Sequence, residues 1–311
     1  MLDVEAALAW AHAEVGNIPR KDAEKIAAMA SIKHVKLSRV KEIERETKHD
    51  VMALVEALAE ACGKSGSYVH LGATSSDVDD TATALQLKDA LMLIGRRLDK
   101  LQKTLRQKTL EFKEPTTMST HVSTVLAFKF SAWMQEISRH VERLRECKER
   151  ILVGKMSGAV GTQAALGVHA VKIQNLVMER LGIRAADIST QIVQRDRYAE
   201  LVYLLVIVAA SLENFAAAIR DLQKPEMDDF FNTGKEIGRS SVLQDETSEA
   251  CRKICGLGRI VRSLAIPALE NVTTWHERDL TQSSAERFII PQSCILVDYM
   301  LFLMADVVAD L

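Results

Sequence analysis

Glycine and proline are scarce in this chain, with 14 glycines and 5 prolines among 311 residues. Neither residue occurs between Thr116 and Val153 or between Ile183 and Lys224. Because both residues interrupt helices, their absence permits helices far longer than the usual mean of about 11–12 residues. Strands of alternating polar and apolar residues and Asn-Gly turns are missing too, which argues against a protein built from β-hairpins.

Cysteine pairs and charge of one sign are also lacking. The five cysteines are odd in number and form no CxxC pair, which disfavours a disulfide framework or a zinc site and indicates a reducing, cytoplasmic compartment. The net charge is -2, with 40 basic and 42 acidic residues, so there is no electrostatic signature of nucleic-acid or membrane binding. Small molecules or further copies of the chain are the expected partners.

Membrane-directing segments are not expected either. The first residues, MLDVEAALAWAHAEVG, are amphipathic and carry acidic residues early, unlike a signal peptide. No uninterrupted apolar run reaches the roughly 18 residues that a membrane span needs, and the closest, LVYLLVIVAASL, is shorter. The sequence therefore predicts no membrane span.

What the chain does contain is apolar residues at helical spacing. They recur at Leu201, Leu204, Leu205, Val208, Leu212, Phe215, Ile219 and Leu222. This pattern predicts an all-α fold in which long helices form a bundle. The first seventy or so residues predict shorter helices, with breaks at residues 16–20 and 62–72.

A long helix is expected to start after residue 74. The Ser/Thr/Asp-rich segment TSSDVDD precedes an apolar run there, and Ser76 and Asp79 have a spacing that resembles a capping box. We therefore expect a small N-terminal helical domain at residues 1–74 and a central bundle of long helices at residues 75–311.

Polar segments interrupt the apolar helices at four places. His49 stands at the head of an apolar helix, and His70, Thr74 and Ser75 precede the long helix, whose free N–H groups and dipole favour an anion. The third place comprises SGAVGTQ and STQIVQRDRYAE. Each also has a plain structural explanation, because such residues commonly cap helices or pack beside them.

The fourth polar segment, Thr273–Phe288, is the densest. Ser283 and Glu286 have capping-box spacing, which predicts a helix that begins near Ser283. Arg278 then lies in the preceding loop and Arg287 in the first turn. Arginines oppose the dipole at a helix N-terminus, so we predict that they converge with Ser283 on a phosphate or carboxylate. The alternative is a solvated turn whose charges pair with each other.

Five segments carry a further pattern: KHDVMALVEAL, HLGATSSDVDDTA, VGKMSGAVGT, TQIVQRDRYAE and ALENVTTWHERDLTQSSAERFIIP. Together they resemble the adenylosuccinate lyases, a branch of the fumarase/aspartase superfamily. The likeness runs along almost the whole chain in the family's order, and WHERDL followed by SSAER is specific to this branch. It implies a homotetramer whose long helices form a central bundle, with each active site assembled from three subunits.

The resemblance implies a reaction as well. Fumarate is eliminated from adenylosuccinate to give AMP, and from SAICAR to give AICAR, in purine biosynthesis, with no metal or cofactor. In such an elimination a base removes a proton from the succinyl Cβ, charge develops on the adjacent carboxylate, and an acid protonates the leaving nitrogen.

Individual roles also follow from the resemblance. His121 corresponds to the general acid, with His49 as its alternative or helper, and Ser241 corresponds to the base that takes the carbon-bound proton. Ser240 supports Ser241. The implied substrate contacts are His70, Thr74, Ser75, Gln191, Ser240, Arg278, Ser283 and Arg287.

The chain departs from the family at four places. The family has an Arg-Tyr segment before the helix that here starts at Met1, and a further helical domain beyond Leu311. Where the family reads roughly GRTHGQHAxPT, this chain reads MSTHVSTVLAFKF, which keeps His121 without its neighbours. Where the family reads GSSxMPHKRNP, this chain reads GRSSVLQDETSEA, which lacks the lysine.

The missing lysine bears on activity. A serine base needs nearby positive charge or backbone N–H groups to stabilise its alkoxide, whereas Gln244, Asp245 and Glu246 follow the serines here. We therefore predict that a polypeptide of this sequence has little lyase activity even if it binds nucleotide. Two other functions stay open: another fumarate-releasing lyase, such as argininosuccinate lyase, or a catalytically silent paralogue with a binding or structural role.

Overall fold

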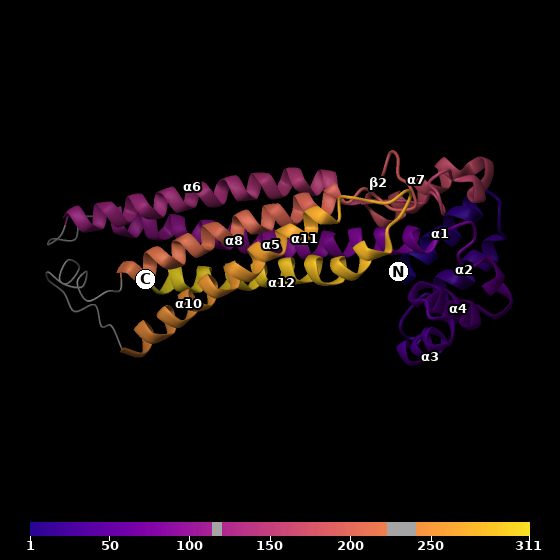
Figure 1. Ribbon diagram of the computed structural model, residues 1–311, viewed down its shortest axis with the longest axis horizontal. Coiled ribbons are helices and arrows are strands. Elements are labelled where there is room, and N and C mark those ends of the chain that lie inside the picture. Colours follow the sequence, from indigo (N-terminus) through magenta and orange to yellow (C-terminus); the bar gives the residue numbers. More distant parts are fainter. Residues whose placement is uncertain (114–119, 223–240) are drawn as a thin grey trace. The chain divides into compact units, whose positions relative to one another are not determined.

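The computed structural model confirms the predicted all-α fold class, because most of its described residues lie in helices (Figure 1). The described parts of the chain are residues 1–113, 120–222 and 241–311, with side chains for residues 1–112, 127–222 and 249–311. Extended structure in these parts is limited to two short strands, β1 (Val153–Gly154) and β2 (Arg184–Ala185). They pair in parallel, with Val153 opposite Arg184.

The chain divides into two compact units, each assembled from separate segments. Unit 1 contains Met1–Lys88, Ile151–Gln194 and Thr274–Asp279. Unit 2 contains Asp89–Arg150, Arg195–Thr273 and Leu280–Leu311. The helix that was expected after residue 74 is α5 (Ser75–Lys113), and both units take part of it. The division of the chain into residues 1–74 and 75–311 stays a prediction.

Short helices form the first part of unit 1, as the sequence predicts. They are α1 (Leu2–Glu14), α2 (Arg20–Met29), α3 (Leu37–Thr47), α4 (Asp50–Cys62) and the 3-10 helix η1 (Gly63–Tyr68). The expected break at residues 16–20 separates α1 from α2, and the one at 62–72 follows α4. Unit 1 continues with the start of α5, β1, the 3-10 helix η2 (Ala164–His169), α7 (Ala170–Leu181) and β2.

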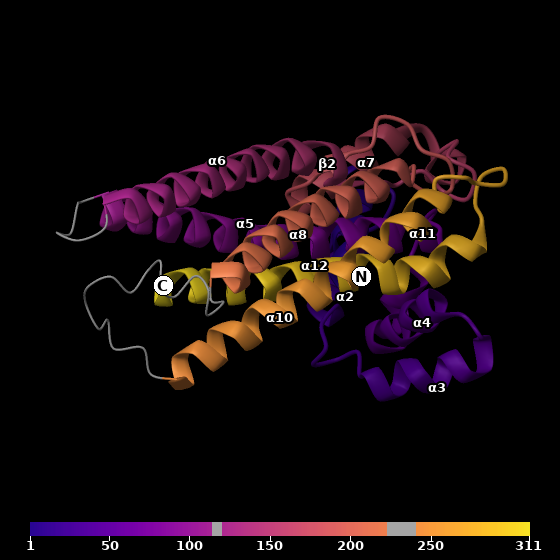
Figure 2. The same ribbon diagram turned by 60° about the vertical axis from the view of Figure 1, so that its left-hand side comes forward.

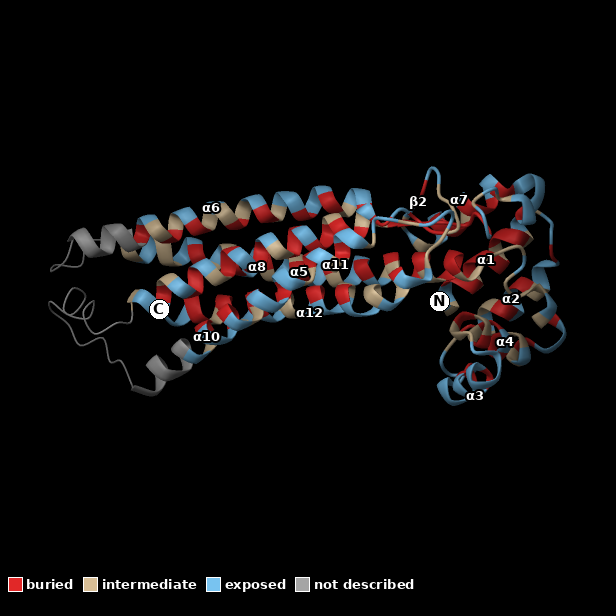
Figure 3. Cartoon of the chain, in the orientation of Figure 1, coloured by how far each residue is buried: buried red, intermediate tan, exposed pale blue. Residues whose placement is uncertain are grey.

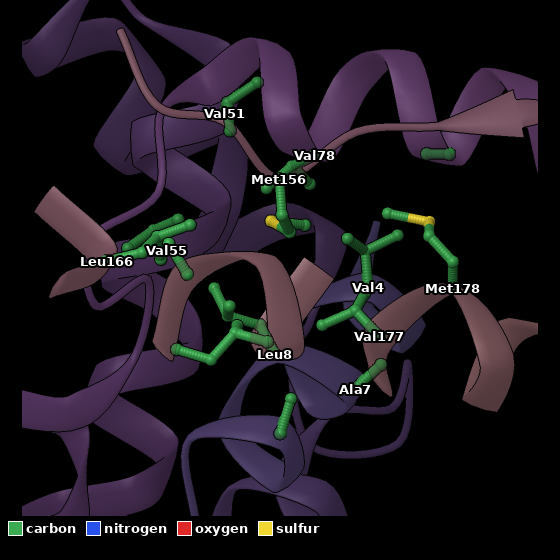
Figure 4. Close-up of a cluster of buried hydrophobic side chains, with 14 residues drawn as sticks. Val4, Ala7, Leu8, Val51, Val55, Val78, Met156, Leu166, Val177 and Met178 are labelled. Atoms are coloured by element: carbon green, nitrogen blue, oxygen red, sulfur yellow. The ribbon is translucent and has the colours of Figure 1, made fainter. Parts of the chain in front are cut away.

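A buried apolar cluster joins α1 to the rest of unit 1 (Figure 4). Its members include Val4, Leu8, Val51, Val55, Val78, Met156, Leu166, Val177 and Met178. They come from α1, α4, α5, α7 and the segment between β1 and α7. Because burial of one aliphatic side chain contributes about 1.5–3 kcal/mol, this cluster fixes α1 within unit 1. It thereby also fixes the buried polar side chains of α1, Glu5 and His12.

The long helices predicted for the bundle lie in unit 2 and run alongside one another (Figures 1 and 2). They are the second part of α5, α6 (Thr120–Ile151), α8 (Asp196–Leu222), α10 (Ser241–Ser263) and α12 (Leu280–Asp310), with the short α11 (Ala265–Glu270) between the last two. The apolar positions predicted for α8, from Leu201 to Ile219, are buried. Figure 3 shows buried residues as a stripe along each helix, with exposed residues on the opposite side.

Two helices bear on the prediction of no membrane span, which stays a prediction. By length and composition, α8 and α12 both qualify, with mean hydropathies of 2.0 and 1.8 over their most apolar windows. However, 56% of that window in α8 and 44% in α12 is buried inside the structure. Because core helices of soluble proteins pass the same test, these two helices are weak evidence for a membrane span.

Candidate active site

The start of α5 is fixed by Asp77, a fully buried carboxylate. One of its oxygens accepts the backbone N–H of Thr74 at 2.8 Å, so Thr74 and Asp77 form the capping interaction. The prediction that Ser76 and Asp79 would form it is therefore wrong by two residues. The physical reason is that several Ser, Thr and Asp residues lie close together in TSSDVDD, so more than one capping pair is possible. The tertiary contacts of Asp77 favour the pair of Thr74 and Asp77.

Asp77 also anchors the segment after β1. Its carboxylate pairs with the ammonium group of Lys155, which is fully buried as well. It accepts the backbone N–H groups of Ser157 at 2.9 Å and Gly158 at 3.1 Å. A buried ion pair is favourable only when its remaining polar atoms are hydrogen-bonded, and here backbone donors from two segments meet that need. Lys155 and Asp77 thereby join the second and third polar segments of the sequence.

Ser157 extends this network to the fourth polar segment. Its Oγ lies 2.9 Å from Ser189 Oγ and 3.3 Å from the carbonyl oxygen of Thr190. The Oγ1 of Thr190 in turn donates to the carbonyl oxygen of Glu277 at 2.9 Å. Gly161 permits this approach, because a Cβ there would lie only 2.2 Å from the Ser189 carbonyl oxygen. Segments up to 200 residues apart therefore meet within unit 1.

Gln191, a predicted substrate contact, lies half-buried in the segment between β2 and α8. Its position is fixed from both sides. Thr190 binds Glu277 as described, and the N–H of Val193 donates to the buried carboxylate of Asp80 at 2.8 Å. The backbone around Gln191 is therefore held to the start of α5.

His49 and Ser75, two further predicted site residues, are brought together. His49 caps α4, because its Nδ1 accepts the backbone N–H of Met52 at 3.4 Å. Its Nε2 lies 3.4 Å from Ser75 Oγ. An accepting Nδ1 places the ring proton of a neutral imidazole on Nε2, so the N–H group is directed at Ser75. With 43% of its side chain exposed, His49 can be reached by a solute.

His70 is held by a residue that sequence reasoning missed. Its Nδ1 lies 2.6 Å from a carboxylate oxygen of Glu5, which is buried on α1. The missed residues of unit 1 are Glu5, Asp77 and Lys155. Asp77 lies in the segment TSSDVDD, where Ser76 and Asp79 were singled out instead, and the available signal for Lys155 was its place as a single charge within VGKMSGAVG.

The structure corrects the predicted start of the last helix. α12 begins at Leu280, and Ser283 Oγ donates to the Leu280 carbonyl oxygen at 3.0 Å. Ser283 and Glu286 therefore form no capping box. Glu286 instead accepts from Arg195 Nε at 2.8 Å, in a pair with 7% and 13% of the two side chains exposed. This buried contact holds the first turns of α12 to the start of α8.

The proposed anion-binding residues are divided between the two units. Arg278 lies in the loop before α12, as predicted, and belongs to unit 1. Ser283 and Arg287 lie in the first two turns of α12 and belong to unit 2. Their convergence on one anion stays a prediction.

The remaining predicted residues are covered only in part. The backbone of His121 lies in the first turn of α6 and that of Ser241 starts α10, but their side chains are outside the described residues. Ser240 lies outside them altogether. Across the described part of the chain, no group of three or more His, Cys, Asp and Glu residues is placed to hold a metal ion.

Comparison with known proteins identifies the family. Residues 1–241 match the family model described as Lyase. The chain is 49% identical to adenylosuccinate lyase of Pyrococcus horikoshii and 48% identical to that of Pyrococcus abyssi. Both alignments include 100% of this chain and 71% of the relative. The first comparison extends over 320 residues, so the relative carries residues that this 311-residue chain lacks.

Solved structures share the fold. A fumarate lyase from Mesorhizobium matches with a TM-score of 0.84 and 27% identity, over 99% of this chain and 71% of that one. A 3-carboxy-cis,cis-muconate lactonizing enzyme from Pseudomonas putida matches with the same TM-score and 29% identity, over 99% and 70%. The family match, the two relatives and the shared fold together establish that the chain belongs to the adenylosuccinate lyase family.

Proposed function

We propose that the chain acts as a carbon–nitrogen lyase that eliminates fumarate from adenylosuccinate to give AMP, and from SAICAR to give AICAR. The observation that carries this proposal is the 48–49% identity, along the whole chain, to relatives named adenylosuccinate lyase. The product AMP and both substrates are anionic, which suits the helix start, the histidines and the arginines of the candidate site.

In the proposed elimination, Ser241 takes the proton from the succinyl Cβ, with Ser240 in support. Because Gln244, Asp245 and Glu246 follow the serines in place of the family's lysine, we expect this step to be slow in a chain of this sequence. The C–N bond then breaks, the carbon–carbon double bond of fumarate forms, and His121 protonates the leaving nitrogen. His49 is the alternative or auxiliary acid. The contacts of its ring support this role, because the proton sits on Nε2, beside Ser75, at a partly exposed position.

Substrate binding is proposed to use the start of α5 and the start of α12. Thr74, Ser75 and His70 contact the substrate's anionic groups at the first, where backbone N–H groups and the helix dipole favour negative charge. Arg278, Ser283 and Arg287 bind the nucleotide and its phosphate at the second. Gln191 completes the substrate contacts, and no metal or cofactor is required.

The working form is proposed to be a homotetramer in the cytoplasm, with active sites shared between subunits. Exposed apolar side chains on the long helices support the assembly. On α8, Tyr203 and Ile207 are 38% and 44% exposed, and on α12, Ile295 and Tyr299 are 60% and 41% exposed. Further copies of the chain would cover these faces. The near-neutral charge supports the absence of nucleic-acid and membrane partners.

The deciding experiment measures fumarate release from adenylosuccinate, SAICAR and argininosuccinate side by side. Release from the first two supports the proposal, and release from the third alone favours an argininosuccinate lyase. If none is cleaved while AMP still binds, the chain is a silent paralogue or lacks the loop residues of its relatives. The intact mass separates these cases. A mass near 34.5 kDa means that the loop residues are absent, and a clearly larger mass means that they are present and the chain is a silent paralogue.

Variants test the individual roles. Arg278→Ala and Arg287→Ala should each weaken AMP binding by roughly 1.5–3 kcal/mol, the usual effect of a lost charge-assisted hydrogen bond. Unchanged affinity in both variants would move the anion site elsewhere. His121→Ala should lower turnover much more than binding, and the reverse pattern would make His121 a substrate contact.

A further inference from the structure

Glu5 makes an unusual set of contacts with His70. It lies on α1 with none of its side chain exposed. One carboxylate oxygen is 2.6 Å from His70 Nδ1, and the other accepts the backbone N–H of His70 at 3.1 Å. Both oxygens therefore bind the same residue, once through its ring and once through its backbone.

His70 has a strained backbone that these contacts hold in place. Its φ is +62°, the left-handed region, which is unfavourable for a residue with a Cβ. Gly72 follows with φ of +70°, and a Cβ there would lie 2.8 Å from the Ala165 carbonyl oxygen. The turn at residues 70–72 is thus packed closely from the η2 side while Glu5 binds it from α1. Strain of this kind persists where the surroundings fix it, and it is enriched at active sites.

A second anchor on α1 holds the next residue of the turn. His12 lies two turns after Glu5, and its Nε2 is 2.9 Å from the Leu71 carbonyl oxygen. Asn17 Nδ2 is 3.0 Å from His12 Nδ1. Burial lowers the pKa of His12, so the neutral ring accepts from Asn17 and donates to Leu71. His12 therefore fixes the backbone of the turn without contacting the His70 ring.

Packing alone does not explain a carboxylate at position 5. The neighbouring Val4 and Leu8 belong to the apolar cluster of unit 1 (Figure 4). An apolar residue at position 5 would avoid the cost of burying a charged group. The hydrogen bonds that the Glu5 carboxylate makes to the described part of the chain both go to His70. Besides its attraction for the Met1 ammonium group, its contribution is therefore to hold that histidine.

We propose that Glu5 is a positioning residue that keeps a proton on Nδ1 of His70, so that the ring can take a second proton on Nε2 when the anionic nucleotide binds and donate this N–H group to it. An ionised carboxylate can only accept hydrogen bonds, so the nitrogen beside it must be the donor. The partner of one ring nitrogen thereby fixes the role of the other. The proposal rests on the proposed function in one respect, namely that His70 contacts the substrate.

The protonation of His70 can be measured without substrate. In protein labelled with ¹⁵N-histidine, long-range ¹H–¹⁵N correlations identify the protonated ring nitrogens, and the His70→Gln variant assigns the His70 signals by their loss. We expect a proton on Nδ1 of His70 in the unmodified chain. A neutral ring protonated on Nε2 alone would overturn the proposal. This result holds whether or not the chain has lyase activity, and it does not depend on the folding of any variant at Glu5.

The variant Glu5→Gln tests the link to binding. Its side chain has the same shape, but its amide group can donate to Nδ1 and thereby move the ring proton to Nε2. We expect this change of tautomer together with at least about tenfold weaker binding of AMP, measured by calorimetry, because a ring whose Nδ1 accepts from the new amide cannot also carry the positive charge that the bound anion favours. The matched control is His12→Leu, which removes the second anchor and should lower stability while the His70 tautomer stays unchanged.

The outcomes separate the proposal from the function on which it rests. An unchanged tautomer in Glu5→Gln, or a changed tautomer with unchanged AMP affinity, overturns the positioning role. If the unmodified chain binds no AMP, the proposed function fails at that point, whereas the protonation of His70 in the unmodified chain still supports or overturns the action of Glu5 on the ring.

Discussion

Replacing Lys155 with Met should destabilise the protein strongly, although the two side chains have similar volumes. The change leaves the buried carboxylate of Asp77 without its ammonium partner. Breaking a buried ion pair from one side typically costs about 3–5 kcal/mol. The backbone N–H groups of Thr74, Ser157 and Gly158 still stabilise the carboxylate, so we expect the lower end, about 3 kcal/mol.

The reciprocal change, Asp77→Asn, should cost more. It leaves the ammonium group of Lys155 without a counter-charge, and the new amide group must face at least one of the N–H donors that now point at a carboxylate oxygen. Both effects leave buried donors unsatisfied, which costs about 1–3 kcal/mol for each neutral group. We therefore expect Asp77→Asn to exceed Lys155→Met by at least about 1 kcal/mol.

Urea unfolding measures both changes, with Lys100→Met as the matched control. Lys100 pairs with Asp306 at 2.9 Å, but the two side chains are 50% and 44% exposed. Such a surface pair contributes about 0–1 kcal/mol. If Lys155→Met costs no more than Lys100→Met, the buried pair does not stabilise the fold in the way that its geometry indicates. If Asp77→Asn is the milder of the two, the backbone donors contribute less than inferred here.

Three further predictions concern unit 2. Burial lowers the pKa of His140 to about 4, so the unfolded chain takes up the proton at a higher pH than the folded chain does. The free energy of unfolding should therefore fall by up to about 3 kcal/mol as the pH drops from 6.5 to 4. His140→Gln should flatten this pH dependence in unfolding experiments at several pH values. Burial also raises the pKa of Cys147 to about 12, so iodoacetamide at pH 8 should label it only after unfolding, and rapid labelling of the native protein would contradict this. Arg195→Ala removes the guanidinium group that pairs with Glu286 and lies 5.1 Å from the Tyr198 ring, so it should cost about 2–4 kcal/mol. Arg195→Lys should recover only part of this, because lysine cannot reproduce the two-point contact with the carboxylate.

The sequence predicted the helices well because their signals are repeated many times. Eight apolar positions along α8 agree with one another, and seven of them are buried. The helix starts were less predictable. Overlapping Ser, Thr and Asp residues near the start of α5 offer several capping pairs, and the buried Lys155 favours the pair that contains Asp77. Near the start of α12, Glu286 forms an ion pair with Arg195 instead of the predicted capping box with Ser283.

The candidate site was predictable only as separate polar segments. The sequence pattern identifies His49 and Ser75 as separate helix-start residues. It does not predict that these two residues, 26 positions apart, make contact. The same holds for Lys155 and Asp77, which are 78 positions apart. Glu5 was not recognised because a single acidic residue in the first turn of an amphipathic helix has an ordinary explanation, namely the helix dipole. Only its burial and its two contacts with His70 distinguish it.

The fold and the reaction are determined by different parts of this chain. Two solved structures match with the same TM-score of 0.84, yet one is called a fumarate lyase and the other a lactonizing enzyme, so the helix bundle alone does not select between these reactions. We propose that the selection comes from side chains at the helix ends, where the polar segments of unit 1 meet through Asp77, Ser157 and Thr190. Glu5 and Lys155 reach those helix ends from buried positions. A substitution at Glu5 is therefore expected to change the site without changing the bundle, whereas a substitution at Lys155 affects both the site and the stability of the fold.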